Sequence, residues 1–136
     1  MQIRASASFR AGDVERTFAA ISSRVEAAVA NGANAVLDIS RQIVPVRTGD
    51  LASSGGVDME RKKLSVVAAV SYTSGHAAYV EFGTGRRGAE SGNAAPGIEY
   101  DPNWPGMTGT PYIRPALDSG RPDIMAAFDA EGFKFR

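Results

Sequence analysis

The chain has 136 residues, and its fifteen lysines and arginines balance fifteen aspartates and glutamates, giving a formal net charge of +0 at pH 7. This length is typical of one domain (residues 1–136) that buries a core, and a hydrophobic content of 43% is that of a globular protein. The charge balance argues against a tight, nonspecific nucleic-acid binder but leaves transient contact with DNA open, while the absence of cysteine excludes disulfide scaffolds, thiolate metal sites and cysteine nucleophiles.

The first ten residues, MQIRASASFR, alternate between polar and apolar or small side chains from Gln2 to Arg10. This period of two predicts a strand with one solvent-facing side. The segment lacks the apolar run of a signal peptide, and the longest aliphatic stretch of the chain, Val66 to Val70, is far too short to cross a bilayer. We therefore expect a soluble protein that is made inside a cell and does not contact a membrane.

One long helix is predicted from about residue 13 to residue 44, with Asp13 as its N-cap and Pro45 as its end. Asn31-Gly32 could be a turn between two helices, but the apolar stripe passes through it without a change of phase. At 1.5 Å per residue the helix would be roughly 48 Å long, so we expect it to lie along a sheet and to offer part of its length to a neighbouring subunit. The stripe, spaced three or four residues apart, consists of Val14, Phe18, Ile21, Val25, Ala28, Gly32, Val36, Ile39 and Ile43.

A β-hairpin is predicted next. Val57 and Met59 alternate with polar residues, Arg61-Lys62-Lys63 form a charged turn, and alternation resumes from Leu64 to Val70. The segment His76 to Phe82 is too short to assign by period. It fits a strand or a turn of helix, and either would end at Gly83.

Residues 83–110 contain seven of the fifteen glycines and three prolines and show almost no periodicity, which predicts one long loop. A short extended piece, residues 111–113, then precedes a C-terminal helix with Pro115 at its first position. We expect Pro122 to restart this helix after Gly120. Its apolar stripe is sparse and consists of Leu117, Ile124 and Phe128.

The sequence GTGRRG at residues 83–88 fits the G-x-G-x-x-G pattern of dinucleotide-binding loops. The pattern has that meaning only where a strand runs into a tight turn and then a helix. No helix is predicted in the AESGNAAPG that follows, so we interpret the match as a coincidence. Gly83 and Gly85 are expected instead to allow backbone conformations that other residues avoid.

Other candidate chemistry is sparse. His76 is near Glu81 in the sequence and could act as a base oriented by a carboxylate, but no nucleophile or second histidine accompanies it, and a solvated loop histidine explains it better. The acidic residues are scattered singly, so we expect no catalytic, cofactor or metal site. Arg86 and Arg87 could contact phosphate with Trp104 and Tyr100 as stacking partners. We favour the simpler interpretation, in which the arginines keep a loop soluble and Trp104 contacts a neighbouring protein.

Three motifs together resemble a known family: PVRTGDL at 45–51, AAYVEFGTG at 77–85 and PYIRPAL at 111–117. In this order they are similar to the tail-component family of long-tailed bacteriophages, the neck or tail-completion proteins of lambdoid-type siphophages. The resemblance implies a noncatalytic α+β subunit with a long N-terminal helix and a C-terminal helix packed on a small, mainly antiparallel sheet. Its interface or structural positions would be Thr48, Gly49, Leu51, Tyr79, Glu81, Phe82, Gly83, Thr84, Gly85, Tyr112, Arg114 and Pro115, with Arg86, Arg87 and Trp104 as further contacts to DNA or a partner.

The resemblance further implies a ring of identical subunits, expected to be a hexamer, in the virion neck between the head connector and the tail tube, where double-stranded DNA passes. A tail terminator or head-closure subunit is the alternative within this class, and a small nucleotide- or nucleic-acid-binding protein that uses GTGRRG is the alternative outside it. The loop between the last two motifs is longer than in the usual pattern. Because Glu81 and Arg114 stand beside the motifs that bracket it, we expect them to form a charge-assisted pair.

Overall fold

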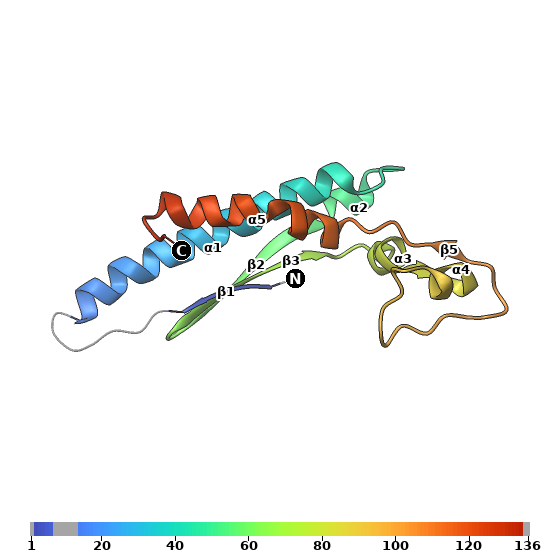
Figure 1. Cartoon of the computed structure of the whole chain (residues 1–136), viewed down its shortest axis with the longest axis horizontal. Coiled ribbons are helices and arrows are strands. Elements are labelled where there is room, and N and C mark those ends of the chain that lie inside the picture. Colours follow the sequence, from blue (N-terminus) through green and yellow to red (C-terminus); the bar gives the residue numbers. More distant parts are fainter. Residues whose placement is uncertain (1, 7–13, 135–136) are drawn as a thin grey trace.

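The computed structural model describes residues 2–6 and 14–134, and shows an elongated α+β protein (Figure 1). One long helix lies over a three-stranded sheet, a second long helix packs against the first, and a small lobe of short elements extends from one end of this body. The elements are β1 (Gln2–Ser6), α1 (Val14–Ile43), α2 (Asp50–Ser53), β2 (Gly55–Lys62), β3 (Ser65–Tyr72), α3 (Ala77–Phe82), β4 (Gly83–Thr84), α4 (Gly85–Glu90), β5 (Met107–Thr108) and α5 (Ile113–Ala130).

The main sheet is antiparallel, in the order β1-β3-β2. Its register pairs Ile3 with Ala68 and Val57 with Val70, so the predicted N-terminal strand and hairpin are both present. Residues 7–10 of the predicted strand lie outside the described residues. The hairpin turn differs slightly from the prediction: Lys62 pairs with Ser65, so the turn is residues 63–64 rather than 61–63.

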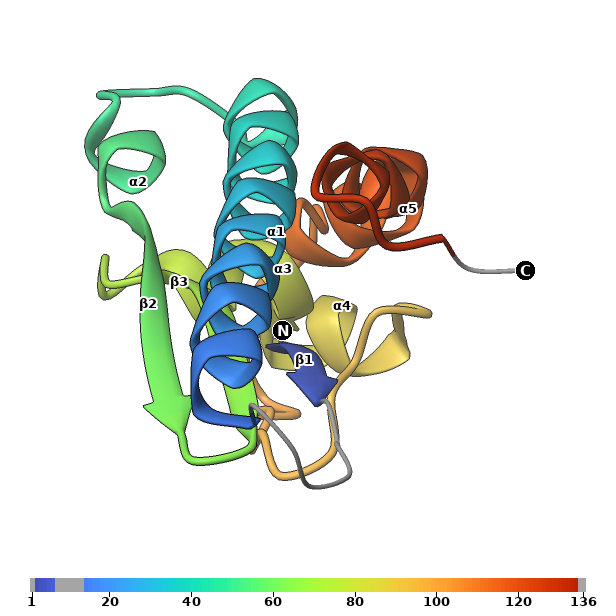
Figure 2. The ribbon, with the colours of Figure 1, turned by 90° about the vertical axis from the view of Figure 1, so that its left-hand side faces the viewer.

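Helix α1 is continuous through Asn31-Gly32, as its apolar stripe predicts. It is buried on two sides because it lies between the sheet and α5, as the end-on view shows (Figure 2). Its sheet-facing residues, which include Val29 and Leu37, form one core with Val66, Ala68 and Val70 of β3. The core therefore lies under the middle of α1, and Phe128 brings α5 into it.

Helix α5 runs antiparallel to α1 (Figure 1). Gly120 lies so near that an added Cβ would be 3.0 Å from Val36 Cγ2. At the far end of α5, Arg24 of α1 donates a hydrogen bond from Nε to the carbonyl of Glu131 at 2.8 Å and lies 5.1 Å from the ring centre of Phe133. These contacts hold the two helices together along the length of α5.

Several expectations about the C-terminal helix and about residues 83–110 are wrong. The C-terminal helix begins at Ile113, so Ile113 is helical rather than extended and Pro115 is the third residue of the helix rather than the first. The helix also continues through Pro122 without restarting. Residues 83–110 are not one loop, because they contain β4, α4 and β5. The segment 76–82, left open by the sequence, is helical and ends at Gly83.

Candidate functional site

The carboxylate of Glu81 caps the N-terminus of α5. Glu81 is on α3 and is only 4% exposed. Its Oε2 accepts hydrogen bonds from the backbone N–H groups of Tyr112 at 2.7 Å and Ile113 at 3.0 Å, and its Oε1 accepts one from Arg114 at 3.4 Å. The first N–H groups of a helix have no partner within it and carry the positive end of its dipole, so a buried carboxylate is well compensated here.

The predicted pair of Glu81 and Arg114 takes a different form. Arg114 contributes its backbone N–H, its side chain is exposed, and no ion pair joins the two side chains. The backbone contact costs less conformational entropy than an ion pair with the Arg114 side chain would, because the start of a helix presents three donors without ordering a long side chain. Glu81 therefore joins the second and third motifs through the helix terminus rather than through a salt bridge.

Tyr112 extends this contact to the main body. Its side chain is fully buried, its hydroxyl donates to the Ala77 carbonyl at 3.2 Å, and its ring meets that of Tyr72 edge-on at 4.9 Å. Burial, with the charge of Glu81 and the neighbouring Tyr72 as smaller causes, raises the pKa of Tyr112 to about 12. Ser40 of α1 donates to the Leu37 carbonyl, so the 2.6 Å contact between Ser40 and Tyr72 uses the Tyr72 hydroxyl as donor.

The small lobe is closed by backbone pairing between its ends. Strands β4 and β5 are antiparallel, Thr84 Oγ1 accepts a hydrogen bond from the Met107 N–H at 3.1 Å, and the Thr110 N–H donates to the Val80 carbonyl at 2.6 Å. Tyr100 closes the loop from within by donating to the Phe82 carbonyl at 3.3 Å. At Gly83, with φ of 81°, an added Cβ would be 2.5 Å from the Gly109 nitrogen, so a side chain is excluded.

The GTGRRG segment forms a short strand, β4, followed by a helix, α4. The expectation that no helix accompanies this pattern is therefore wrong. Helix α4 begins at Gly85, inside the pattern. However, the N–H groups at its start are already used: Arg86 donates to the Trp104 carbonyl at 2.9 Å and Arg87 to the Pro105 carbonyl at 3.0 Å. A Cβ on Gly85 would be 2.5 Å from the Trp104 oxygen. Because Gly85 has no side chain, the backbone of Trp104 can approach the start of α4, where it occupies the position that a bound phosphate would need.

The PVRTGDL motif forms a separate turn between α1 and β2. The Thr48 hydroxyl donates to Asp50 Oδ2 at 2.8 Å, and Gly49 has a left-handed φ of 88° just before α2. Leu51, in α2, is half-buried. This motif shapes its own turn, and only the second and third motifs meet around Glu81.

Four other predicted positions are on the surface of the lobe, whereas Phe82 is half-buried and Pro115 is exposed on α5. Tyr79 and Trp104 are each 54% exposed, and the side chains of Arg86 and Arg87 are exposed on α4. His76 is exposed before α3, whereas the Glu81 carboxylate is buried against α5, so the two do not form a catalytic pair. In the described ranges, 2–6 and 14–134, no group of acidic or histidine side chains could hold a metal ion, and no helix has the length and apolarity to cross a bilayer.

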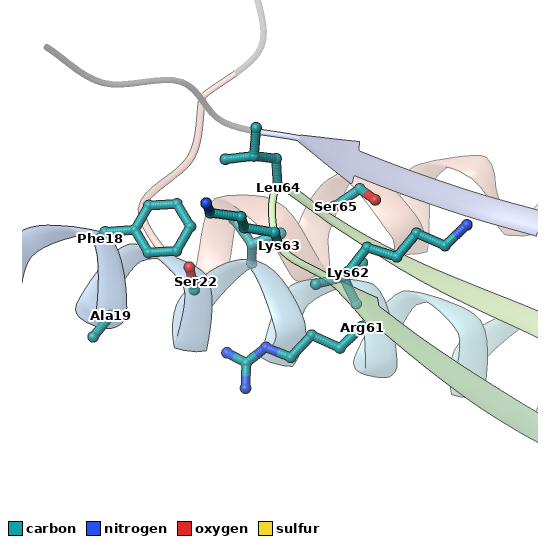
Figure 3. A pocket seen from close by; sticks show the side chains of 10 residues that line it. Phe18, Ala19, Ser22, Arg61, Lys62, Lys63, Leu64 and Ser65 are labelled. Atoms are coloured by element: carbon teal, nitrogen blue, oxygen red, sulfur yellow. The ribbon is translucent and has the colours of Figure 1, made fainter. Parts of the chain in front are cut away.

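No periodic pattern in the sequence predicts the pocket at the opposite end of the molecule. It lies between the first part of α1 and the turn of the β2–β3 hairpin and has a volume of about 460 Å³ (Figure 3). Leu64 in this turn is 57% exposed. The available clue is that an apolar residue, Leu64, directly follows the three cations of a turn that is expected to face solvent. The lining residues are Phe18, Ala19, Ser22, Val25, Arg61, Lys62, Lys63, Leu64, Ser65 and Val66.

The model of the family described as "Bacteriophage HK97-gp10, putative tail-component" matches residues 10–83, more than half of the chain. The match contains the first motif and most of the second, and ends at Gly83, before α4, β5 and the third motif. No curated protein and no solved structure matches the chain. On the evidence of the family match, this chain belongs to the HK97-gp10-like family of bacteriophage tail components, which are structural proteins rather than enzymes.

Proposed function

We propose that the protein is a ring-forming neck or tail-completion subunit, which joins the head connector to the tail tube around the channel for DNA. Membership of the tail-component family is the observation that carries this proposal. In this proposal the subunit is made in the host cytoplasm and becomes part of the virion. Its partners are identical subunits, a head-closure or connector protein on one side and a tail terminator or tail-tube protein on the other.

The placement of apolar surface supports a ring. Large exposed apolar side chains occur toward both ends of the molecule: Tyr79, Trp104 and Met107 in the lobe, and Leu64 at the hairpin turn. A ring needs a head-to-tail interface, in which two different surfaces of one subunit meet their complements on its neighbours. An elongated subunit with unlike apolar ends meets that requirement.

The charge balance agrees with a channel through which DNA slides. Several simultaneous phosphate contacts would hold the DNA, and their strength would depend steeply on salt. A net charge of +0 avoids such an attraction. Arg86 and Arg87 remain the cations of the lobe that could meet DNA in passing, because both are exposed.

Imaging of phage particles tests the proposal. Particles that carry a tagged copy of this chain should show ring-shaped label density between head and tail, and particles without the chain should accumulate as filled heads and separate tails. Label at the tail end of the tube, or normal joined particles without the chain, would contradict a joining role. Label stacked directly on the connector or on the tail tube would separate a head-closure subunit from a tail terminator.

The nucleotide-binding alternative has its own test. A ligand present at 100 times its dissociation constant stabilises a protein by about 2.7 kcal/mol, which is readily seen as a rise in Tm. Because carbonyl oxygens occupy the N–H groups at the start of α4, we expect ATP, GTP and NAD to leave the Tm unchanged. A clear rise with any of them would favour the alternative.

A further inference from the structure

The pocket at the hairpin end is apolar inside and basic at its rim. Phe18 of α1 and Leu64 of the hairpin turn line it from two sides, with Val25 and Val66 among its other apolar residues (Figure 3). Its volume of about 460 Å³ falls within the range of pockets that bury a drug-sized group, roughly 300–1,000 Å³. An aromatic side chain is a suitable occupant, because it fills such a pocket with little loss of conformational freedom.

The opposite end of the molecule presents an aromatic side chain of this kind. Trp104 is 54% exposed, yet its backbone is fixed. Its N–H donates to the Asp101 carbonyl at 3.3 Å, its carbonyl accepts from Arg86, and Asp101 Oδ1 accepts from the Asn103 N–H at 2.8 Å. A tight turn thus holds the indole outward before any partner is bound, which lowers the entropy cost of docking.

The charges at the two ends are complementary. Residues 88–110 contain Glu90, Glu99 and Asp101 and no lysine or arginine. At the pocket, Arg61 is paired with Glu26 at 3.2 Å and Lys62 with Glu60 at 3.5 Å, which leaves the charge of Lys63 at the hairpin turn. The segment that carries Trp104, residues 88–110, is therefore an acidic arm, preceded in the lobe by the exposed cations Arg86 and Arg87, whereas the hairpin turn carries the cation of Lys63. Such a pairing favours head-to-tail orientation over the reverse.

The two features cannot meet within one copy, because they lie at opposite ends of the long axis (Figure 1). We infer that Trp104 of one copy inserts into the pocket between α1 and the hairpin of the next copy, where Lys63 faces the acidic arm. This inference rests on the proposed ring and names the surfaces that close it. It predicts a heterologous contact, repeated around the ring.

Trp104 is the only tryptophan, so its fluorescence reports the contact directly. As protein concentration rises and mass photometry shows assembly, the emission of wild-type protein should shift to shorter wavelength over the same concentration range. Trp104→Ala should weaken assembly by about 30-fold or more, the usual effect of removing an interface hot spot. Ala19→Trp, which fills the pocket from its wall, should weaken assembly comparably. Met125→Ala, at an exposed apolar side chain on α5, is the matched control and should assemble normally.

Charge exchange and crosslinking test the orientation of the contact. Lys63→Glu and Glu99→Lys should each weaken assembly, and the double variant should recover it. Because the chain has no cysteine, Leu64→Cys combined with Asn103→Cys, which keeps Trp104, should yield on oxidation a ladder of covalent dimers, trimers and larger multimers. Rings that form equally well with Trp104→Ala and Ala19→Trp would overturn the inference and leave the proposed function intact. Wild-type protein that forms no ring, alone or in particles, would overturn both.

Discussion

A carboxylate at residue 81 performs a task usually given to a small polar residue at the start of a helix. Serine, threonine, asparagine and aspartate cap helices from within the same segment. Glu81 comes from α3, 31 residues before Tyr112, and so caps α5 across the chain. Its three hydrogen bonds fix the direction in which α5 leaves the lobe. The charge is buried, but it is opposed by the helix dipole and by three donors, so the site is compensated as a whole.

Replacement of Glu81 by alanine should lower the free energy of unfolding by about 2–4 kcal/mol, since it leaves several N–H groups near the start of α5 without a partner. Glu81→Gln keeps one acceptor oxygen and should cost roughly half as much. Urea denaturation measures both. The matched control, Glu99→Ala on the exposed part of the loop, should change stability by less than about 0.5 kcal/mol. An alanine variant as stable as wild type would show that water replaces the carboxylate without loss.

Tyr112 predicts a loss of stability at high pH. Its pKa is raised from 10.0 to about 12 in the folded protein, chiefly by burial. Below pH 10 the hydroxyl is neutral in both the folded and the unfolded chain, and its contribution is complete. Between pH 10 and 12 the unfolded chain loses the proton first and thus binds fewer protons, so the free energy of unfolding falls as pH rises.

The comparison with Tyr112→Phe isolates this effect from the titration of other tyrosines and of lysines. The variant loses the hydrogen bond to Ala77 and should be less stable by about 1 kcal/mol at pH 7. The variant's deficit in stability should shrink above pH 10 and change sign before pH 12, as followed by urea denaturation at each pH, because the effect of the raised pKa outweighs a hydrogen bond worth about 1 kcal/mol. Parallel stability curves for the two proteins would show that Tyr112 does not titrate with a raised pKa.

At the scale of elements, Gly120 sets the distance between α5 and α1. An added Cβ would be 3.0 Å from Val36 Cγ2 and 3.2 Å from Ile39 Cδ1, so a branched side chain would force the helices apart. We expect Gly120→Val to lower the free energy of unfolding by about 1–3 kcal/mol. Ala126→Val, at an exposed position on the same helix, is the control and should cost only the difference in helix propensity, below about 1 kcal/mol. Equal effects of the two changes would show that α5 can move away from α1 at little cost.

Elements with a sustained period were predictable from the sequence, because burial of one face imposes that period. The α1 stripe predicts nearly its full length, and alternation predicts both hairpin strands. The predicted restart of the helix at Pro122 is wrong because tertiary contact outweighs local preference. Gly120 is buried against α1, and Pro122 removes only one hydrogen bond from a helix that packs against its neighbour.

The interior of the 83–110 segment could not be predicted for the opposite reason. Its strands are two residues long, and its helix is six. Pieces this short have no readable period, and they persist only through pairings such as that of Arg86 with the Trp104 carbonyl. The form of the Glu81 contact could not be predicted either. The motifs predicted that Glu81 and the residues around Arg114 meet, but the choice of backbone over guanidinium depends on where α5 begins.

At the scale of the whole molecule, apolar burial is uneven. The residues of the main hydrophobic core belong to α1, β3 and α5, and none belongs to residues 83–110. The lobe is held by hydrogen bonds, by the Glu81 contact and by Tyr100. Segments with few buried apolar contacts open locally at a lower free energy than the whole protein.

Hydrogen exchange should therefore divide the molecule in two. Amides in the buried middle of α1 and β3, such as those of Val36 and Ala68, should exchange only through global unfolding, whereas amides that pair within the lobe, such as those of Arg86 and Thr110, should exchange together at a lower free energy. Mass spectrometry of peptides from each part measures this difference. Protection of the lobe equal to that of α1 would mean that both unfold as one unit. A lobe that opens separately could adjust to a neighbouring subunit while the α1–α5 body keeps its shape, as assembly from preformed subunits requires.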